Sequence, residues 1–433
     1  NFLTNNISNG INKEDKEVIG QLERITSQSI PDSYENNNSL DKTTIVLSNS
    51  CNLRCKYCYV DGGNYNQNIE DEFMTSETIQ KITDYVHNVY GGTKRVAYFG
   101  GEPLLNFKVL KDHVLYYKKL VEEDRVEKLP TFSITTNGTI YSDEIFSFLN
   151  QHNFVVGISI DGNKSLHDEL RKDCFNKGSY DKIIANINKI RRKFPELKLI
   201  YEATYTNLHQ KRGFSIDRLR KIIVEQTSIS DGVIVPVMEN KANINKDLYF
   251  TDLTVLYNIL LEESEKIWGS YTCGEPIFDQ EIADFLRTFK KRIKSPMICN
   301  MGKSFVTVTS NGDLYPCQTL LNNQEMIIGN IFENKKTNQE KLNSFYTKFR
   351  KINKFKNPEC QKCIAINLCM GCPARWYYEK NTTAPWPLFC KSVKEQVKNN
   401  LTRIIEIRNS PQKWQKFKES LDNIKKNKTL CEY

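Results

Sequence analysis

The sequence has no run of 18 consecutive apolar residues, and it does not open with the charged-then-apolar pattern of a secretion signal. The first absence excludes an ordinary transmembrane helix, and the second excludes a cleaved signal peptide. No internal repeat is evident beyond an alternation of strand-like and helix-like segments. We therefore expect a soluble, cytoplasmic protein with no membrane partner.

Acidic residues are present but outnumbered. There are 61 Lys and Arg against 52 Asp and Glu, which gives a net charge of +9. This balance favours an acidic partner, either nucleic acid or an acidic peptide, although a solvated lysine-rich surface explains it equally well. The length of 433 residues fits two domains, or one large barrel with an appendage.

Cysteine is abundant, with 13 residues, and ten of them fall into closely spaced groups. In a reducing cytosol, grouped cysteines indicate metal ligands rather than disulfides. The remaining three are Cys174, Cys273 and Cys431. We expect the first two to be buried structural thiols and the third to be incidental.

Strand-like and helical segments alternate from residue 43 to residue 238. Such alternation predicts parallel βαβ units and an α/β fold. We favour an open or partial (β/α)6 barrel of the TIM type over a doubly wound sheet, although periodicity alone does not separate them. Either fold binds ligands at the carboxyl ends of its strands. The predicted strands are 43–48, 96–99, 132–136, 154–160, 197–206 and 233–238, and the predicted helices are 110–121, 142–150, 180–190 and 215–224.

Composition and pattern change along the chain at four places. These changes predict an N-terminal arm containing a short helix, a barrel, a helical connector, a cysteine-rich domain and a basic amphipathic helical tail. The corresponding ranges are 1–42, 43–240, 241–297, 298–391 and 392–433.

The first cysteine group is Cys51-x3-Cys55-x2-Cys58, directly after the first predicted strand. Three thiolates on one loop can hold three irons of a [4Fe-4S] cluster and leave the fourth iron open to a ligand. Zinc is the alternative, but structural zinc takes four ligands, and no further Cys or His lies nearby. The spacing therefore favours an iron–sulfur cluster.

This segment resembles the signature of the radical S-adenosylmethionine (SAM) superfamily. The resemblance implies that the open iron binds the amino and carboxylate groups of SAM. It also implies an external electron donor, of the reduced flavodoxin or ferredoxin type. The electron would cleave SAM to give a 5′-deoxyadenosyl radical, which abstracts a hydrogen atom. Tyr57 stands where the family has an aromatic residue against the adenine.

Other SAM contacts follow from the same resemblance. Gly100, Gly101 and Glu102 match the motif for the SAM amino group, although a Gly-Pro turn alone explains them. Thr135 and Asn137 end the third strand and are expected near the ribose, although turn chemistry also accounts for Asn-Gly. The resemblance further implies that SAM is bound by residues at the ends of later strands. Of these, Ser159 and Arg171 would hold the carboxylate, Asp161 lies on the same turn, and Met238 would lie against the adenine unless it packs in the core.

The second set of cysteines lies between residues 299 and 390. Two-residue spacers would also suit zinc. The pattern nevertheless resembles the SPASM domain, the iron–sulfur extension of radical SAM peptide modifiers. It departs from that family in having two residues, not three, between the last cysteines of the central quartet. The resemblance implies two auxiliary clusters, one held by Cys299, Cys317 and Cys372 and the other by Cys360, Cys363, Cys369 and Cys390.

Two complete four-iron clusters need eight thiolates, and the pattern supplies seven. Either the nearer cluster has an open iron or another residue, such as Cys273, fills it. An open iron could bind a substrate thiolate. With the first cluster, the sequence predicts SAM and three [4Fe-4S] clusters.

The residue after Cys317 bears on the substrate. Sulfatase maturases of the SPASM family carry an Asp base there, whereas this chain has Gln318. The sequence resembles instead the thioether-forming maturases of sactipeptides and ranthipeptides, which implies a cysteine-containing precursor peptide as partner. Alternatives are a sulfatase maturase, a carbon–carbon cross-linker or an epimerase. A zinc protein that binds nucleic acid is the alternative of another class, and we expect no nucleic-acid partner.

Overall fold

The computed structural model describes residues 39–63, 73–238, 246–250, 253–274, 276, 282–283, 285–286, 296–321, 323–363, 365–369 and 371–426. The predicted N-terminal helix and Cys431 lie outside these residues. Among the helices of the described part, none is both long enough and apolar enough to span a membrane.

Within the described residues, nine strands form one sheet in the order β6-β5-β4-β3-β2-β1-β7-β8-β9. The first six strands are all parallel, which confirms the predicted α/β barrel topology. They are β1 Lys42–Ser48, β2 Arg95–Gly100, β3 Thr131–Thr136, β4 Val155–Ser159, β5 Lys198–Tyr205 and β6 Gly232–Pro236.

The cysteine-rich region continues the same sheet, which the sequence did not predict. Strand β7 (Phe305–Val308) pairs with β1 in parallel, so that Lys42 lies opposite Phe305. Strands β8 (Asp313–Tyr315) and β9 (Gly329–Asn330) follow in antiparallel orientation. Both parts of the chain therefore share one continuous backbone ladder.

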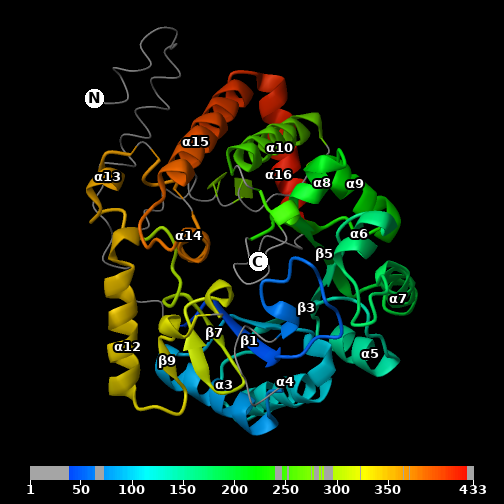
Figure 1. Ribbon diagram of the computed structural model, residues 1–433, viewed down its shortest axis with the longest axis vertical. Coiled ribbons are helices and arrows are strands. Elements are labelled where there is room, and N and C mark those ends of the chain that lie inside the picture. Colours follow the sequence, from blue (N-terminus) through cyan, green and yellow to red (C-terminus); the bar gives the residue numbers. More distant parts are fainter. Residues whose placement is uncertain are drawn as a thin grey trace.

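Helices cover the outer side of the parallel strands (Figure 1). Ser142 caps the helix α5 (Asp143–Gln151) by accepting a hydrogen bond from the backbone N–H of Ile145, as predicted. The helix that follows the first cysteine loop begins after Thr75, whose side chain caps it, and was not predicted. These helices are α3 Ser76–Tyr90, α4 Phe107–Glu122, α5 Asp143–Gln151, α6 Lys164–Leu170, α7 Tyr180–Lys193, α8 Asn207–Lys211 and α9 Ile216–Thr227.

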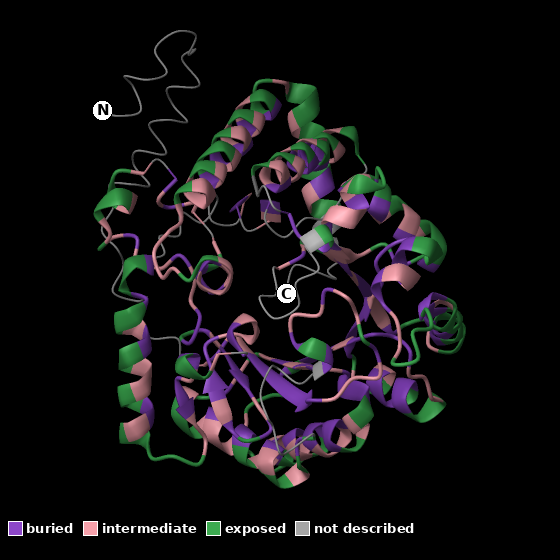
Figure 2. Cartoon of the chain, viewed as in Figure 1, coloured by how far each residue is buried: buried purple, intermediate pink, exposed green. Residues whose placement is uncertain are grey.

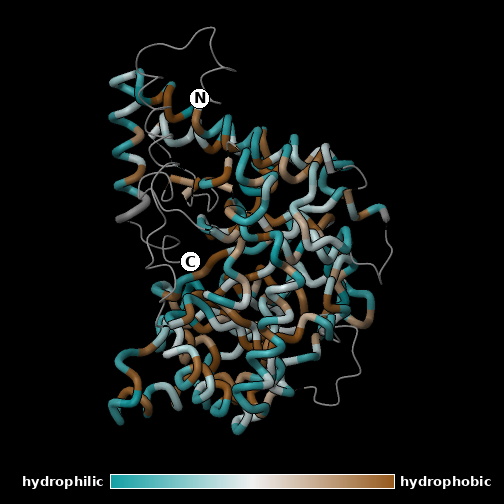
Figure 3. The backbone as a smooth tube through the Cα atoms, turned by 90° about the vertical axis from the view of Figure 1, so that its left-hand side faces the viewer, coloured by the Kyte–Doolittle hydropathy of each residue, from teal (hydrophilic) through white to brown (hydrophobic). Residues whose placement is uncertain are grey.

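Side chains alternate along each strand between the helical layer and the barrel interior. In β5, Tyr201, Ala203 and Tyr205 are buried, whereas Glu202 and Thr204 between them are half-buried. Among the strands, β1 and β4 are the most continuously buried (Figure 2). Hydrophobic and hydrophilic residues alternate around the covering helices (Figure 3). The face of β5 that carries Glu202 therefore points away from the main core.

A second helical group packs together through Trp268, Tyr271 and Phe417. The predicted tail is two helices, because the second starts at a proline, Pro411, a residue favoured in the first turn of a helix. The group consists of α10 Leu253–Cys273, α15 Pro387–Arg408 and α16 Pro411–Lys426. The remaining helices are α12 Lys335–Lys348, α13 Pro358–Gln361 and α14 Pro373–Lys380, with short 3-10 turns η2 Asp61–Gly63, η3 Pro103–Asn106, η4 Lys246–Leu248, η5 Gln318–Leu320, η6 Gln324–Met326 and η7 Arg350–Ile352.

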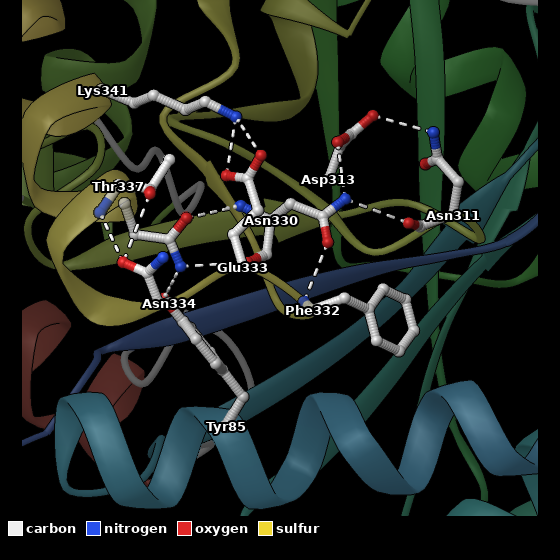
Figure 4. A network of polar contacts seen from close by, with 10 residues as sticks. Tyr85, Asn311, Asp313, Asn330, Phe332, Glu333, Asn334, Thr337 and Lys341 are labelled. Carbon is white, nitrogen blue, oxygen red and sulfur yellow. Dashed lines mark hydrogen bonds and ion pairs between the residues drawn. The ribbon is translucent and has the colours of Figure 1, made fainter.

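Asparagine side chains tie β9 to α12 and to the barrel (Figure 4). The buried Asn338 amide accepts a hydrogen bond from the Asn330 backbone N–H at 2.9 Å and donates to the Asn330 carbonyl at 2.9 Å. It also donates to the Tyr85 hydroxyl of α3 at 2.9 Å. Asn330 in turn donates to Asp313 of β8 at 2.8 Å. The network joins the end of the sheet to the first barrel helix.

Candidate active site

The first cysteine loop follows β1 and is held against the turn after α6. The Arg54 and Lys56 backbone N–H groups donate to the carbonyls of Lys172 and Leu170, at 2.6 and 2.9 Å. The Arg54 guanidinium donates to the Cys51 carbonyl at 2.5 Å. Cys51, Cys55 and Cys58 lie on this one loop, and burial raises the pKa of Cys55 to about 12.

A buried polar network lies directly beside this loop. The Tyr57 hydroxyl donates to Asp161 Oδ2 at 2.5 Å and accepts from Arg171 Nη1 at 2.6 Å. Arg171 Nη1 is 3.8 Å from Asp161 Oδ2. The Arg171 Nε donor is buried and has no hydrogen-bond partner among the residues that the structure describes. A buried guanidinium with a spare donor fits an additional anionic group, such as a carboxylate.

The turn after β2 packs against the start of the cysteine loop. The Gly101 and Glu102 backbone N–H groups donate to the carbonyls of Ser48 and Ser50, at 2.8 and 2.9 Å. A Cβ at Gly101 would lie 2.3 Å from the Ser50 oxygen, and one at Gly100 would lie 2.4 Å from the Ser48 oxygen. Only glycine permits this approach, which explains both residues.

Glu102 is completely buried, and its carboxylate organises the ends of β2 and β3. It accepts hydrogen bonds from the Leu104 and Asn137 backbone N–H groups at 3.0 and 2.7 Å, and from the Thr136 hydroxyl at 2.8 Å. Burial raises the pKa of this carboxyl despite these three donors.

The remaining predicted SAM contacts lie around the same strand ends. The Asn137 amide nitrogen is 3.7 Å from Cys51 Sγ and donates to Asn52 at 2.8 Å. Thr135 donates to Glu202 at 3.1 Å. Ser159 ends β4, opposite Glu202 in the strand register. Met238 lies two residues beyond β6, next to Val237, whose carbonyl accepts from Arg375 of α14 at 3.0 Å.

Cys299, Cys317 and Cys372 form a second group at the other end of β1. Cys299 precedes β7, which runs parallel to β1, and Cys317 follows the antiparallel β8, so both lie where β1 begins. Burial, followed by the nearby Cys372 and Cys299, raises the pKa of Cys317 to about 12. Cys372 caps α14 by accepting from the Arg375 backbone N–H at 3.4 Å.

A third group consists of Cys360, Cys363, Cys369 and Cys390, and one buried lysine lies near the first three. Lys354 is only 2% exposed, and its ammonium donates to the Cys369 carbonyl at 3.3 Å. Burial lowers the pKa of Lys354, and Cys369, Cys360 and Cys363 oppose that effect. The lysine would compensate negative charge on these sulfurs. The spacing of the cysteines did not predict this role for Lys354.

The expectation of buried thiols at Cys174 and Cys273 was wrong, because both are exposed. Cys174 lies in the turn between the bridge residues Lys172 and Gly178. Cys273 is the last residue of α10 and lies about 24 Å along the helix axis from Tyr257, which is within electrostatic range of Cys390.

Within the part of the chain that the structure describes, no three His, Cys, Asp or Glu side chains converge closely enough to ligate one metal ion. A four-iron cluster differs, since each thiolate binds its own iron. Cysteines in groups of three and four, one group beside a buried lysine, fit such clusters.

Polar side chains between the first two cysteine groups face the barrel interior. Gln318, at the start of η5, accepts from the Thr44 hydroxyl of β1 at 3.5 Å. Lys42 of β1 is within electrostatic range of Cys317, Cys299 and Glu202, and burial lowers its pKa. Burial raises the pKa of Tyr59, and the nearby Cys58, Cys317 and Glu202 act in the same direction.

Together, the parallel barrel and the cysteine groups at its two ends define an iron–sulfur barrel enzyme. Residues 45–211 match the radical SAM superfamily, and residues 299–364 match SPASM, an iron–sulfur cluster-binding domain. The chain therefore contains a radical SAM domain followed by a SPASM domain.

Curated relatives match over most of the chain. The cysteine-type anaerobic sulfatase-maturating enzyme of Clostridium novyi is 28% identical over 384 residues, covering 84% of this chain and 96% of the relative. The serine-type enzyme of Bacteroides thetaiotaomicron is 25% identical and covers 75% of this chain and 80% of the relative.

Solved structures share the fold. The structure of anSMEcpe with bound AdoMet, which is SAM, aligns with a TM-score of 0.68 at 22% identity, covering 85% of this chain and 99% of that one. The same protein has been solved with AdoMet and the Kp18Cys peptide. Streptococcus suis SuiB bound to its precursor peptide SuiA aligns with a TM-score of 0.55 at 18% identity, covering 87% of this chain and 81% of that one.

Proposed function

We propose that the chain is a peptide maturase that joins a cysteine sulfur to a carbon of another residue in a ribosomally made precursor peptide. A peptide substrate is supported by the peptide complexes of anSMEcpe and SuiB. The main observation for thioether chemistry is the group of three cysteines, Cys299, Cys317 and Cys372, with the amide Gln318 beside it.

The exposed position of Cys273 supports an incomplete ligand set. Tyr257 of α10 is within electrostatic range of Arg375 and Glu379 of α14, the helix that Cys372 caps. Cys273 lies about 24 Å further along the axis of α10, so it is poorly placed to add a fourth thiolate to this group. We assign a [4Fe-4S] cluster with an open iron to the three cysteines, and the open iron would take the substrate sulfur. We assign a complete [4Fe-4S] cluster to Cys360, Cys363, Cys369 and Cys390.

Residues around the first cysteine loop are assigned to the first cluster and to SAM. Cys51, Cys55 and Cys58 would hold three irons of the cluster. Arg171, with its unpaired Nε, and Ser159 would take the SAM carboxylate, while Tyr57 and Asp161 hold Arg171 in place. Bound SAM would supply the hydrogen-abstracting radical. The turn at Gly100, Gly101 and Glu102 would take the amino group, Thr135 and Asn137 the ribose, and Met238 the adenine.

The remaining assignments concern the parts of the chain and its electron supply. We keep the proposed division into an arm (1–42), a barrel (43–240), a connector (241–297), a SPASM domain (298–391) and a tail (392–433). An external donor of the reduced flavodoxin or ferredoxin type would deliver electrons to the first cluster.

Sulfatase maturation is the second candidate, because the relatives that match most of the chain carry that function. It would require a proton acceptor other than Gln318, since a carboxamide is not a base at neutral pH.

Mass spectrometry separates the two candidates. The enzyme, SAM and a reductant are incubated without oxygen with a cysteine-rich precursor peptide encoded beside its gene, and in parallel with a sulfatase peptide. Thioether formation predicts loss of two hydrogens per link and cysteines that cannot be alkylated after reduction. A modified sulfatase peptide beside an unchanged precursor would contradict it.

A further inference from the structure

Glu202 is the acidic side chain on the interior face of β5. It is bonded by Thr135, an assigned ribose contact, but neither the motif analysis nor the cofactor assignments give Glu202 itself a role. Its neighbours along the strand, Tyr201 and Ala203, are buried on the helical side. Alternation therefore turns Glu202 to the interior. Thr135 of β3 donates to its Oε1 at 3.1 Å.

The carboxylate reaches Thr135 by lying across β4 at Gly157. A Cβ at Gly157 would be 2.9 Å from Glu202 Oε1 and 3.5 Å from Thr135 Oγ1. The missing side chain at Gly157 therefore makes the space that the carboxylate occupies. Two strands thus fix the position of one acid group, by a hydroxyl on β3 and an absent side chain on β4.

The charged and titratable groups near Glu202 lie beside both the first and the second cysteine groups. Lys42, at the start of β1, is influenced by Glu202, Cys317 and Cys299. Arg171 acts on Glu202 from the side of the first loop, and Tyr59 is influenced by Cys58, Cys317 and Glu202. Burial raises the pKa of Glu202, while Thr135, Lys42 and Arg171 oppose that effect. Glu202 is thus within electrostatic range of groups at both ends of the barrel interior.

We propose that Glu202 is the catalytic base that accepts the proton of the substrate cysteine, which Gln318 cannot do. This inference rests on the proposed thioether function. The S–H bond breaks and its proton moves to the Glu202 carboxylate. The sulfur electron pair forms the C–S bond to the carbon that has lost one hydrogen atom to the SAM-derived radical. This bond leaves one electron over, which an oxidised iron–sulfur cluster held by the assigned cysteines would accept.

Glu202→Gln tests this role, because it keeps the shape and the acceptor for Thr135 but cannot take a proton. General-base removal predicts that the cross-linking kcat falls by roughly 10²-fold or more, with the peptide KM little changed. Deoxyadenosine release from SAM should persist. Peptide affinity, measured by fluorescence anisotropy without SAM, should equal that of the wild type, and the acid limb of the kcat/KM profile should disappear.

Glu202→Asp and Gly157→Ala provide matched comparisons. The aspartate should restore part of the rate together with an acid limb, whereas the alanine keeps the carboxylate but displaces it and should slow cross-linking. The inference is overturned if Glu202→Gln cross-links at the wild-type rate. It is also overturned if this variant loses peptide binding or deoxyadenosine release, since either loss indicates a structural role. A wild-type enzyme that releases deoxyadenosine but never forms the thioether would instead remove the proposed function itself.

Discussion

Burial holds one histidine side chain, His113, in its neutral form at pH values where an exposed histidine would be protonated. His113 is 1% exposed, and burial lowers its pKa to about 3. Its Nδ1 is 2.9 Å from the Tyr98 hydroxyl, and its Nε2 is 2.7 Å from the Thr83 hydroxyl. Thr83 already donates to the Ile79 carbonyl, so it accepts from His113 Nε2–H. His113 Nδ1 therefore accepts from Tyr98, and the ring is neutral.

Protonation of His113 should therefore oppose folding in acid. Its pKa is about 6.5 in the unfolded chain and about 3 in the fold, so the unfolded state binds the proton more readily and stability falls as pH drops through 6.5. Between pH 7.5 and 5 this amounts to about 2 kcal/mol. Denaturant unfolding of wild type and His113→Gln across that range measures it. The variant should show the shallower pH dependence, and equal slopes would contradict the assignment.

Cys372 and Cys174 make a matched pair, because both are exposed thiols but only Cys372 lies near other cysteines. If Cys372 ligates a cluster, Cys372→Ala should lower iron content by up to about four of about twelve irons per chain. Cys174→Ala should leave it unchanged. Iron assay and visible absorbance of anaerobically purified protein measure both. Equal iron in the two variants would remove Cys372 from the ligand set.

Among the elements, β9 and α12 depend on side chains rather than on strand length. β9 has two residues, and Asn338 supplies three of the hydrogen bonds that position it. Asn338→Ala should cost about 1–3 kcal/mol, because it leaves buried partners unsatisfied. Hydrogen exchange should increase in β9 and α12. Asn343→Ala, on the exposed side of α12, is the control, and an equal effect of both variants would contradict the role of the network.

The sequence predicted those elements whose pattern is long and periodic. The six parallel strands were correct, because each contains a short apolar run and most are separated by helical segments. β7, β8 and β9 span four, three and two residues, too few to carry a period, so their union with the barrel sheet was missed. Cysteine spacing indicated the groups, but a lysine is not part of a cysteine motif, so Lys354 was missed although it lies near Cys360 in the sequence. Glu202 is distant in sequence from its partners Thr135 and Lys42. A single charged residue in a strand ordinarily indicates a solvent-facing side, which concealed Glu202.

At the scale of the whole molecule, the extent of side-chain burial differs strongly between segments. Strand β1 is buried at six of its seven residues. Of the described residues in 353–372, only Lys354, Ala365 and Asn367 are buried. The segment that carries Cys360, Cys363, Cys369 and Cys372 therefore has little apolar core of its own.

Removal of iron should loosen that segment selectively, because bound metal supplies folding free energy where packing does not. Hydrogen exchange before and after chelation should rise in 353–372 and stay nearly constant in β1–β5. A uniform rise along the chain would show that the clusters stabilise the whole fold rather than this segment. No change in 353–372 would show that the described contacts alone hold it.

The pairing of β1 with β7 has a consequence for how such an enzyme can evolve. The first two cysteine groups lie beyond opposite ends of one strand that spans roughly 20 Å. A slip of one residue would change their separation by about 3.3 Å and reverse every inward side chain. The separation of the two cysteine groups can therefore change only in steps of about one residue. New substrates are more readily accommodated by altering what lies between the two ends than by moving the ends themselves.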